Sequence, residues 1–334
     1  MNKHFSFPFF SLVLFWLLIS LACNLASTAS DPTAVPLPTS AVVVPETGPE
    51  IQHLSVPAEL PTEESLAFGD QDTSEYAAKK IAPNGDRFTK GWFERPFNAN
   101  TMDTYYPYLD IQRVAVFQDA EWFFGTIEVK GPDEAQGFPA TYGLEIDLDT
   151  DGRGDFLFLA VAPAKGEWSV TGVSVYQDGK KDVGNQLVVG SDPPQTGDGF
   201  EDSVFDQGQG GDPDAAWSRL VDPNTIQIAF KKSLLGDDPA FMISGWAGMD
   251  ELNPAWFDLN DHFTHEQAGA ADPGFPLFYP IKELEKLDNT CRMPVGFDAR
   301  GTEPGLCPTY IPKNAPPPPP GAPDPTEEPP IIIT

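Results

Sequence analysis

The sequence predicts an all-β protein, an antiparallel β-sandwich of jelly-roll type with one short C-terminal helix. Three observations carry this prediction. Between residues 81 and 312 the chain contains many short runs of β-prone residues. Apolar and polar residues alternate within several of these runs, as they do in a strand with one buried face. Gly, Pro and Asp turn signals separate the runs, a pattern typical of sandwiches and jelly rolls.

The expected strands begin with a hairpin. Leu109 to Gln118 and Glu121 to Lys130 are two β-prone runs joined by Asp119-Ala120. Asn224 to Lys231 alternates most regularly, because every second residue from Ile226 is apolar. The other expected strands are residues 142–148, 155–163, 168–176 and 241–249.

One helix is expected, from Ile281 to Asn289. Lys282 and Lys286 stand at helical spacing there, and so do Glu283 and Leu287. The helix lies in a C-terminal extension of the sandwich domain, which we place at residues 81–312.

The N-terminus has the pattern of a targeting segment. Residues 1–22 read as a lipoprotein-type signal peptide, with an apolar run from Phe5 to Leu21. Ile19 to Cys23 resembles a bacterial lipobox, whose cysteine is lipidated, although Ser20 stands where that pattern prefers leucine. Cleavage without lipidation and an uncleaved membrane anchor are the alternatives. We therefore expect a chain on the extracellular face of a bacterial envelope, lipid-anchored at Cys23 or otherwise secreted.

Two further segments are expected to lie outside the sandwich. Residues 23–80 are a Pro/Ser/Thr-rich tether followed by an acidic segment. Residues 313–334 are a Pro-rich tail, which we expect to be disordered.

The cysteine count fits an exported protein. Of three cysteines, Cys291 and Cys307 lie close together in sequence and Cys23 is alone. In an oxidising compartment the close pair is expected to form a disulfide, and lipidation accounts for the third cysteine. A metal site at the pair lacks a nearby CxxC or histidine spacing.

The charge of the chain is strongly negative. It has 50 Asp and Glu against 20 Lys and Arg, a net charge of −30. Such a surface repels nucleic acid phosphates, so we expect no nucleic acid partner. It fits an extracellular protein that binds cations, and it equally fits a generally acidic, soluble surface.

An acidic loop in the middle of the chain predicts a structural calcium site. It follows a strand in which Leu144 and Ile146 alternate with Glu145 and with the first aspartate of the loop. Positions 1, 3, 5 and 9 of a calcium-type loop are carboxylates, position 6 is glycine, and position 7 offers a main-chain carbonyl. These residues are Asp147, Asp149, Asp151, Asp155, Gly152 and Arg153.

The calcium motif is incomplete. Phe158 stands where an EF-hand has its bidentate glutamate, so further ligands must come from elsewhere. A second acidic group, from Gly197 to Asp206, is one source. The alternative is a solvated acidic turn, in which Asp and Gly are favoured without any ion.

Aromatic residues offer weak candidates for ligand binding. Tyr105, Tyr106 and Tyr108 surround Pro107, which excludes this segment from a central strand. We expect the three rings to be exposed and able to stack on sugar rings. The alternative for any single aromatic residue is a place in the sandwich core.

Nothing in the sequence specifies catalysis. His262 and His265 have a spacing that permits a metal pair or a general base, but no H-E-x-x-H pattern is present. A G-x-S-x-G motif is also missing from the sequence. A hydrogen-bonded polar loop is the simpler interpretation of the histidine segment, and we expect a non-catalytic protein.

Two motifs and the loop between them resemble a known family. Asp119 to Val129, DAEWFFGTIEV, resembles the "D-x-x-x-L-Y-V-A-I-x-V" strand of family 9-like carbohydrate-binding modules and DOMON-like sandwiches. Ile226 to Gly236 is similar to their closing strand, although Gln227 and Lys231 replace the usual Glu and Pro. The acidic loop stands where the family often has "D-x-D-x-D-G-x-G-D", and the likeness covers about Leu109 to Met249.

The resemblance implies a sandwich and, in some members, sugar binding; other members bind haem or have no known ligand. The sequence thus predicts a non-catalytic cell-surface lipoprotein with a calcium-stabilised β-sandwich that binds a glycan or another extracellular ligand. A surface hydrolase or processing enzyme and a structural or adhesive envelope protein are the alternatives.

Overall fold

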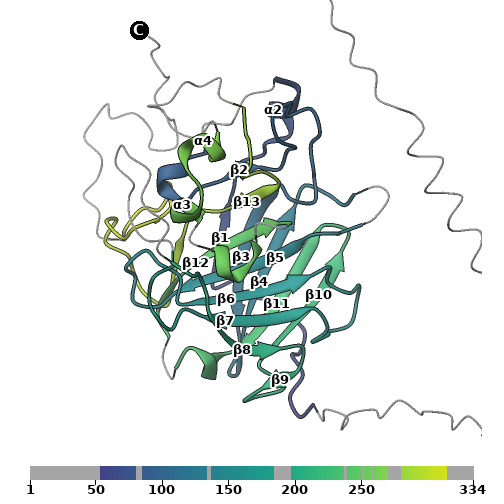
Figure 1. The fold of residues 1–334 in the computed structure, drawn as a ribbon. Coiled ribbons are helices and arrows are strands. Elements are labelled where there is room, and N and C mark those ends of the chain that lie inside the picture. The colour runs from purple at the N-terminus through teal and green to yellow at the C-terminus, as the bar shows by residue number, and fades with distance from the viewer. Residues whose placement is uncertain are drawn as a thin grey trace, which may run out of the picture. The chain divides into compact units, whose positions relative to one another are not determined.

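The computed structural model describes residues 53–79, 85–133, 137–183, 197–236, 239–249, 252–257, 259–269 and 280–313 (Figure 1). The signal peptide, Cys23 and the Pro-rich tail after residue 313 lie outside these residues. Within the described ranges no helix has the length and apolar character needed to cross a bilayer.

Two antiparallel sheets form the domain, which confirms the predicted all-β sandwich. The smaller sheet runs β1 (Leu66–Gly69), β3 (Ile111–Gln118), β4 (Trp122–Val129), β11 (Thr225–Lys231), β10 (Ala216–Asp222). The larger sheet runs β2 (Glu94–Arg95), β13 (Leu287–Asn289), β12 (Phe241–Gly248), β5 (Thr141–Asp147), β6 (Phe156–Val161), β7 (Val173–Gln177), β8 (Asp202–Asp206), β9 (Gln209–Gly210), with β14 (Met293–Val295) paired to β12.

The main core lies between the two sheets. Ile226, Ile228 and Phe230 of β11 are fully buried in it, as the alternation in that strand predicts. Phe230 stacks on Phe158 of the larger sheet, with ring centroids 4.2 Å apart. The sheets approach closely at Gly125, where a Cβ atom would lie 2.3 Å from a methyl group of Leu144. The predicted hairpin is also confirmed, because β3 pairs with β4 across Asp119-Ala120.

A second core covers the outer face of the larger sheet. Leu157, Leu159 and Trp246 project from the strands into it. Short elements close over them: the 3-10 turns η1 (Phe88–Lys90) and η4 (Pro254–Trp256) and the helices α3 (Leu259–His262) and α4 (His265–Ala268). Figure 1 shows α3 and α4 at the end of the sheet where β2, β13 and β12 lie. Short turns and helices cover this face, and residues of η1 and α3 line a pocket on it.

Residues 53–79 belong to the sandwich, so the expected tether up to residue 80 is wrong for this part. β1 pairs with β3 at the edge of the smaller sheet. Upstream, the carboxylate of Asp214 accepts hydrogen bonds from the main chain of Leu54 and Ser55. Helix α2 (Ser74–Lys79) follows β1. A four-residue edge strand is too short for its alternation to be recognised in a polar segment.

The helix expected from Ile281 to Asn289 is also wrong. Leu287–Asn289 forms β13 and pairs with both β12 and β2. Lys286 has a φ of 54°, in the left-handed region, which no helix interior allows. Ile281, Leu284 and Leu287 are fully buried. Their spacing suits a helix face, but pairing with two strands overrides that local signal.

The disulfide between Cys291 and Cys307 is confirmed. It closes the segment that carries Arg292, Glu303 and Pro304. Pro304 packs against the acidic loop at Gly152. A Cβ atom added to Gly152 would lie only 2.4 Å from the Cβ atom of Pro304. The disulfide-closed segment therefore holds one side of the predicted calcium loop.

Candidate cation loop and adjoining pocket

The acidic loop gathers three of its four aspartates. One carboxylate oxygen from each of Asp147, Asp149 and Asp151 lies within 4.8 Å of the other two. Asp147 ends β5, and Gly152 turns the chain with a φ of 94°. The amide of Gly152 donates to Oδ2 of Asp147 at 2.9 Å. This arrangement of oxygen ligands at alternate positions of a tight turn is the one that Ca²⁺ prefers.

Asp147 is the buried member of this group. Its side chain is inaccessible, and Oδ1 has no hydrogen-bond partner among the described residues. Burial raises the pKa of Asp147 to about 7, although Arg292 opposes the shift. An unpartnered buried carboxylate oxygen is costly unless a proton or a cation satisfies it.

Asp155 does not join the three gathered carboxylates, and the main-chain carbonyl of Arg153 stays a predicted ligand. Oδ2 of Asp155 accepts from the amide of Leu148 at 2.7 Å. The guanidinium of Arg153 donates to the carbonyl of Lys181. The Nζ of Lys181 lies 2.6 Å from Asp149 and 3.5 Å from Asp155. An ammonium group therefore supplies positive charge at the exposed side of the loop.

The second acidic group does not supply ligands to the loop. Asp198 pairs with Lys180, and both side chains are exposed. Asp202 and Asp206 are exposed residues of strand β8. Within the described part of the chain, none of these carboxylates is grouped with Asp147.

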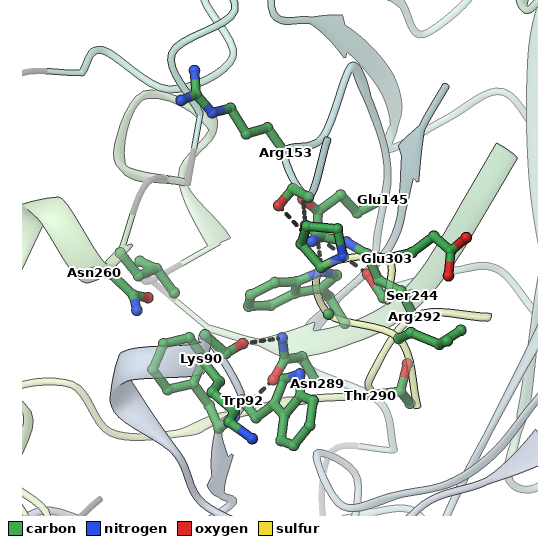
Figure 2. Close-up of a pocket in the computed structure, with 18 of the residues that line it drawn as sticks. Lys90, Trp92, Glu145, Arg153, Ser244, Asn260, Asn289, Thr290, Arg292 and Glu303 are labelled. Carbon is green, nitrogen blue, oxygen red and sulfur yellow. Dashed lines mark hydrogen bonds and ion pairs between the residues drawn. The ribbon is translucent and has the colours of Figure 1, made fainter. Parts of the chain in front are cut away.

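A pocket of about 570 Å³ adjoins the loop on the outer face of the larger sheet. Asp151, Gly152 and Arg153 form one side of it. Figure 2 shows Trp92, Asn289 and Thr290 on another side, and Arg153 extending away from the other labelled side chains. This volume is typical of small-molecule sites.

The floor of the pocket is a polar network centred on Glu145. Its carboxylate accepts from the indole of Trp246 at 2.8 Å, from Ser244 at 3.1 Å and from Arg292 at 2.8 Å. Arg292 also donates to the carbonyl of Gly152 at 2.5 Å (Figure 2). The pocket and the acidic loop are therefore joined by a chain of hydrogen bonds.

Sequence reasoning placed Glu145 correctly on the opposite face from Leu144 and Ile146, but it missed the pocket. Trp92, Arg292 and Asn289 carry no motif, because they meet only when η1, β13 and the disulfide-closed segment fold onto β12. One signal was present, a glutamate that interrupts an apolar strand.

The tyrosine cluster is not the exposed platform that we expected. Tyr108 is 4% exposed and belongs to the main core. Tyr106 is half-buried and packs against the same core. Tyr105 is half-buried, and its hydroxyl donates to Asp110 at 2.6 Å. The expectation of surface exposure is therefore wrong for Tyr108, since Pro107 ends strand pairing without preventing burial.

Neither histidine of the polar segment lies in a carboxylate group. His262 stacks on Trp256 with centroids 5.6 Å apart, and burial lowers its pKa. His265 packs edge-on against Phe88. Both pack against aromatic residues, and within the described ranges neither belongs to a group of potential metal ligands.

No family model, no curated protein and no solved structure matches this chain. The resemblance to family 9-like carbohydrate-binding modules and DOMON-like sandwiches therefore stays a prediction from motifs.

Proposed function

We propose that this chain is a non-catalytic cell-surface lipoprotein that binds a glycan in the pocket beside the acidic loop, and that calcium at this loop stabilises the sandwich. The observation that carries the proposal is the pocket itself. It combines aromatic walls, polar groups and a cation loop on one face of the sheet.

The lining suits a sugar better than an apolar ligand. Trp92 is half-buried, so part of its ring is open, and Lys90 lies over that ring at 4.8 Å. Trp246, Phe93 and Phe257 are buried and give the pocket firm walls. Sugars offer apolar ring faces for stacking and hydroxyls for hydrogen bonds, which match aromatic residues with polar groups between them.

The charges of the lining favour a neutral ligand. Glu145 is paired with Arg292. The carboxylate of Glu303 accepts from three successive amides, at Arg300, Gly301 and Thr302. Because these two carboxylates are already satisfied within the protein, neither is free to pair with a charged ligand. Uncharged hydroxyl groups are the chemistry that fits.

The same network argues against a hydrolase. A general acid must hold a proton within reach of the scissile bond. Glu145 is 2% exposed and accepts three hydrogen bonds from fixed donors. Its carboxylate therefore orders the floor of the pocket, which supports a binding role.

The cation would act by ordering the loop. Asp147, Asp149 and Asp151 repel one another, and a bound Ca²⁺ offsets that repulsion. Through the carbonyl of Gly152 it also fixes Arg292 and hence the pocket floor. Chelation should therefore weaken glycan binding as well as stability.

The test compares two tryptophans on a glycan array, followed by titration of the hits. Trp92→Ala removes the half-open ring of the pocket. Trp256→Ala is the matched control, because Trp256 is 41% exposed and does not line the pocket. Losing about 1.4 kcal/mol of apolar contact corresponds to tenfold weaker binding, so we expect at least about that loss for Trp92→Ala and none for Trp256→Ala.

Two results would contradict the proposal. Absence of binding by the unmodified protein across neutral and charged polysaccharides would favour a structural or adhesive envelope protein. Cleavage of a bound glycan, lost on Glu145→Gln, would favour the hydrolase.

A further inference from the structure

We propose that Asp70, Glu94 and Asp288 form a second, buried site for a divalent cation of the calcium type, separate from the acidic loop. The site goes beyond the proposed function, because it does not require a glycan. Its role is to fasten the N-terminal part of the domain to the strand that carries the pocket wall.

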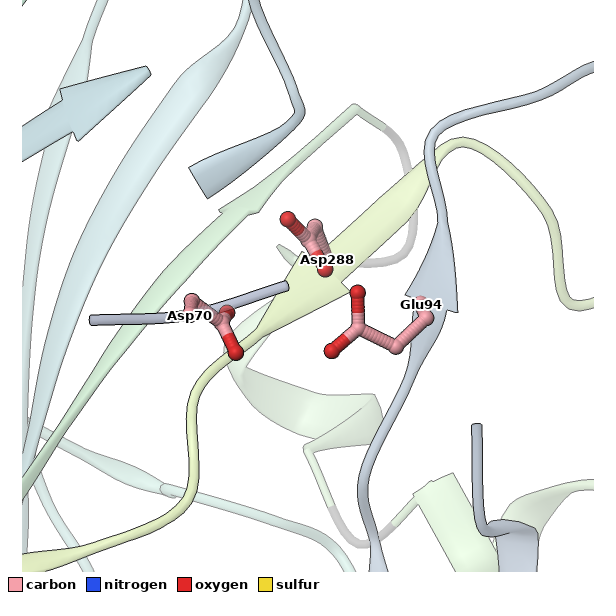
Figure 3. Close-up of side chains that lie close together, drawn as sticks. All are labelled: Asp70, Glu94 and Asp288. Atoms are coloured by element: carbon pink, nitrogen blue, oxygen red, sulfur yellow. The ribbon is translucent and has the colours of Figure 1, made fainter. Parts of the chain in front are cut away.

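The three carboxylates come from three distant parts of the chain. Asp70 directly follows β1, Glu94 lies on β2 and Asp288 lies on β13. One oxygen from each lies within 4.8 Å of the other two. Figure 3 shows the three side chains directed toward a common point, with Glu94 reaching across from its strand toward the other two. Such convergence is expected of ligands and is unusual for charges that repel.

Among the described residues, each carboxylate has an inner oxygen without a hydrogen-bond partner. These atoms are Oδ2 of Asp70, Oε2 of Glu94 and Oδ1 of Asp288, and none is accessible to solvent. Glu94 is 4% exposed and Asp288 is fully buried. The other oxygen of Asp288 accepts from the amide of Ile111 at 2.6 Å, which fixes its orientation. Buried oxygens left unpaired are rare, and an ion or a proton must satisfy them.

The strand register places two of these acids directly against each other. Asp288 of β13 is opposite Glu94 of β2 in an antiparallel pair. Like charges in that position destabilise a sheet. β2 has only two residues in the sheet, so its pairing offers little to offset the repulsion. A cation between the strands turns this repulsion into a bridge.

No described basic side chain neutralises the group. Arg95 is next to Glu94, but its guanidinium is committed elsewhere. It pairs with Asp86 at 2.8 Å and donates to the carbonyls of Ala268 and Leu284. The positive charge that the three carboxylates require must therefore come from protons or from a metal ion.

The acidities agree with a site that takes up a cation. Burial raises the pKa of Asp70 to about 8 and raises the pKa values of Glu94 and Asp288 well above their usual range. Neighbouring carboxylates raise the pKa values of Glu94 and Asp288 further. At Asp70 the carboxylate of Asp110 raises the pKa, and a hydrogen bond with Glu94 opposes the shift. A divalent ion that displaces these protons offsets both the cost of burying charged carboxylates and the repulsion between them.

Asp110 lies close to the three carboxylates, but we do not count it as a ligand because both of its oxygens accept hydrogen bonds from the protein. Its Oδ2 accepts from the amide and hydroxyl of Thr73 and from Tyr105, and its Oδ1 accepts from Gln112. Both oxygens are thus occupied. The ligand set of carboxylate oxygens alone suits a hard cation, Ca²⁺ above softer metals.

The consequence for the fold is a cross-link. An ion here joins the end of β1 and the short strand β2 to β13. Phe93 and Asn289, the neighbours of Glu94 and Asp288, line the pocket, and the amide of Phe93 donates to Asn289 at 2.7 Å. The buried cation therefore stabilises one wall of the pocket from behind.

The test counts calcium in the purified chain. The protein is stripped with EDTA, equilibrated with Ca²⁺ or Mg²⁺, desalted and analysed by mass spectrometry for metal. Asp149→Asn with Asp151→Asn removes the exposed loop site. We expect about two Ca²⁺ per chain in the unmodified protein, about one in the loop variant, and none when Glu94→Gln is added.

A matched control and a second variant keep the outcome clear. Asp72→Asn removes an exposed carboxylate two residues from Asp70 that pairs with Lys130, and it should leave the count unchanged. If Glu94→Gln fails to fold by circular dichroism, Asp70→Asn replaces it, because Asp70 is only half-buried.

The proposal is overturned if the loop variant retains no calcium, or if it still retains one ion after Glu94→Gln or Asp70→Asn. Retention of Mg²⁺ in place of Ca²⁺ would overturn the assignment to a calcium-type ion. None of these results depends on whether a glycan binds.

Discussion

Two acidic regions of this molecule both consist of three carboxylates, but they differ in sequence spacing and in how many of the carboxylates are exposed. The loop carboxylates Asp147, Asp149 and Asp151 lie within five consecutive residues, and two of them are exposed. The carboxylates of Asp70, Glu94 and Asp288 come from opposite ends of the domain, and the latter two are buried. The first group is visible in the sequence, and the second exists only in the folded chain.

The comparison shows what each region demands of a cation. The exposed loop has Lys181 as an internal source of positive charge, and water screens its repulsion. The buried group has neither screening nor a described basic partner. The exposed Asp149 and Asp151 therefore need a cation less than the buried group does, whereas the buried Asp147 needs one for the same reason as that group.

The largest expected effect is a pH dependence of the chelated protein. The folded pKa values of Asp147 and Asp70 are raised to about 7 and about 8, whereas both carboxyls ionise near pH 4 in the unfolded chain. Between these values the folded state holds more protons, so stability falls as pH rises from about 4 to about 8. Asp147 alone accounts for up to about 4 kcal/mol.

Urea denaturation in EDTA and in Ca²⁺ measures this effect. With calcium bound the decline should largely disappear, because the ion replaces the protons. A chelated protein whose stability rises across that range would contradict the burial of these unpaired carboxylates.

Removal of the disulfide should affect the two carboxylate groups differently. Cys291→Ala with Cys307→Ala should lower the free energy of unfolding by about 3 kcal/mol, from the entropy of the loop that it closes. Because the closed segment packs Pro304 against Gly152, calcium affinity of the exposed loop should also fall. The buried group should keep its ion. Equal weakening of both sites would mean that they are not independent.

Gly152→Ala should damage the exposed loop locally. Gly152 and Gly166 have φ values of 94° and 95°, so alanine strains the backbone equally at both. At Gly166 nothing lies within 4 Å of the added Cβ, whereas at Gly152 it meets Pro304. We expect about 1 kcal/mol of destabilisation for Gly166→Ala and about 1–3 kcal/mol more for Gly152→Ala. Thermal denaturation of the two variants side by side measures the difference, and equal losses would remove the proposed contact.

The smallest effect is expected at Lys181. Lys181→Gln removes the ammonium that competes for Asp149, so calcium affinity of the loop should rise, by less than about fivefold. Lys180→Gln is the control, because Lys180 pairs with Asp198 outside the loop. Calorimetric titration distinguishes the two. A loss of affinity in Lys181→Gln would show that the lysine supports the loop.

The sandwich was predictable because its strands carry local patterns. Alternation in residues 224–231 and the turn at Asp119-Ala120 gave β11 and the β3–β4 hairpin. β1 and β13 were not predicted, because they are held in the sheets by pairing with strands far away in the chain. The buried spacing of Ile281, Leu284 and Leu287 even pointed to a helix, since burial alone does not distinguish the two structures.

The site divides in the same way. The acidic loop follows from spacing, and the disulfide follows from cysteine counting. The pocket and the buried carboxylates do not, because a lone glutamate or aspartate in a chain with 50 acidic residues carries no information about its neighbours. Only the register that places Glu94 opposite Asp288 reveals their relation.

The central claim, that cations hold the sandwich at both regions, is tested most directly by anomalous diffraction from crystals grown with terbium in place of calcium. The account predicts one peak among Asp147, Asp149 and Asp151 and a second among Asp70, Glu94 and Asp288. A map with no peak at either place, in crystals that contain terbium elsewhere, would contradict it.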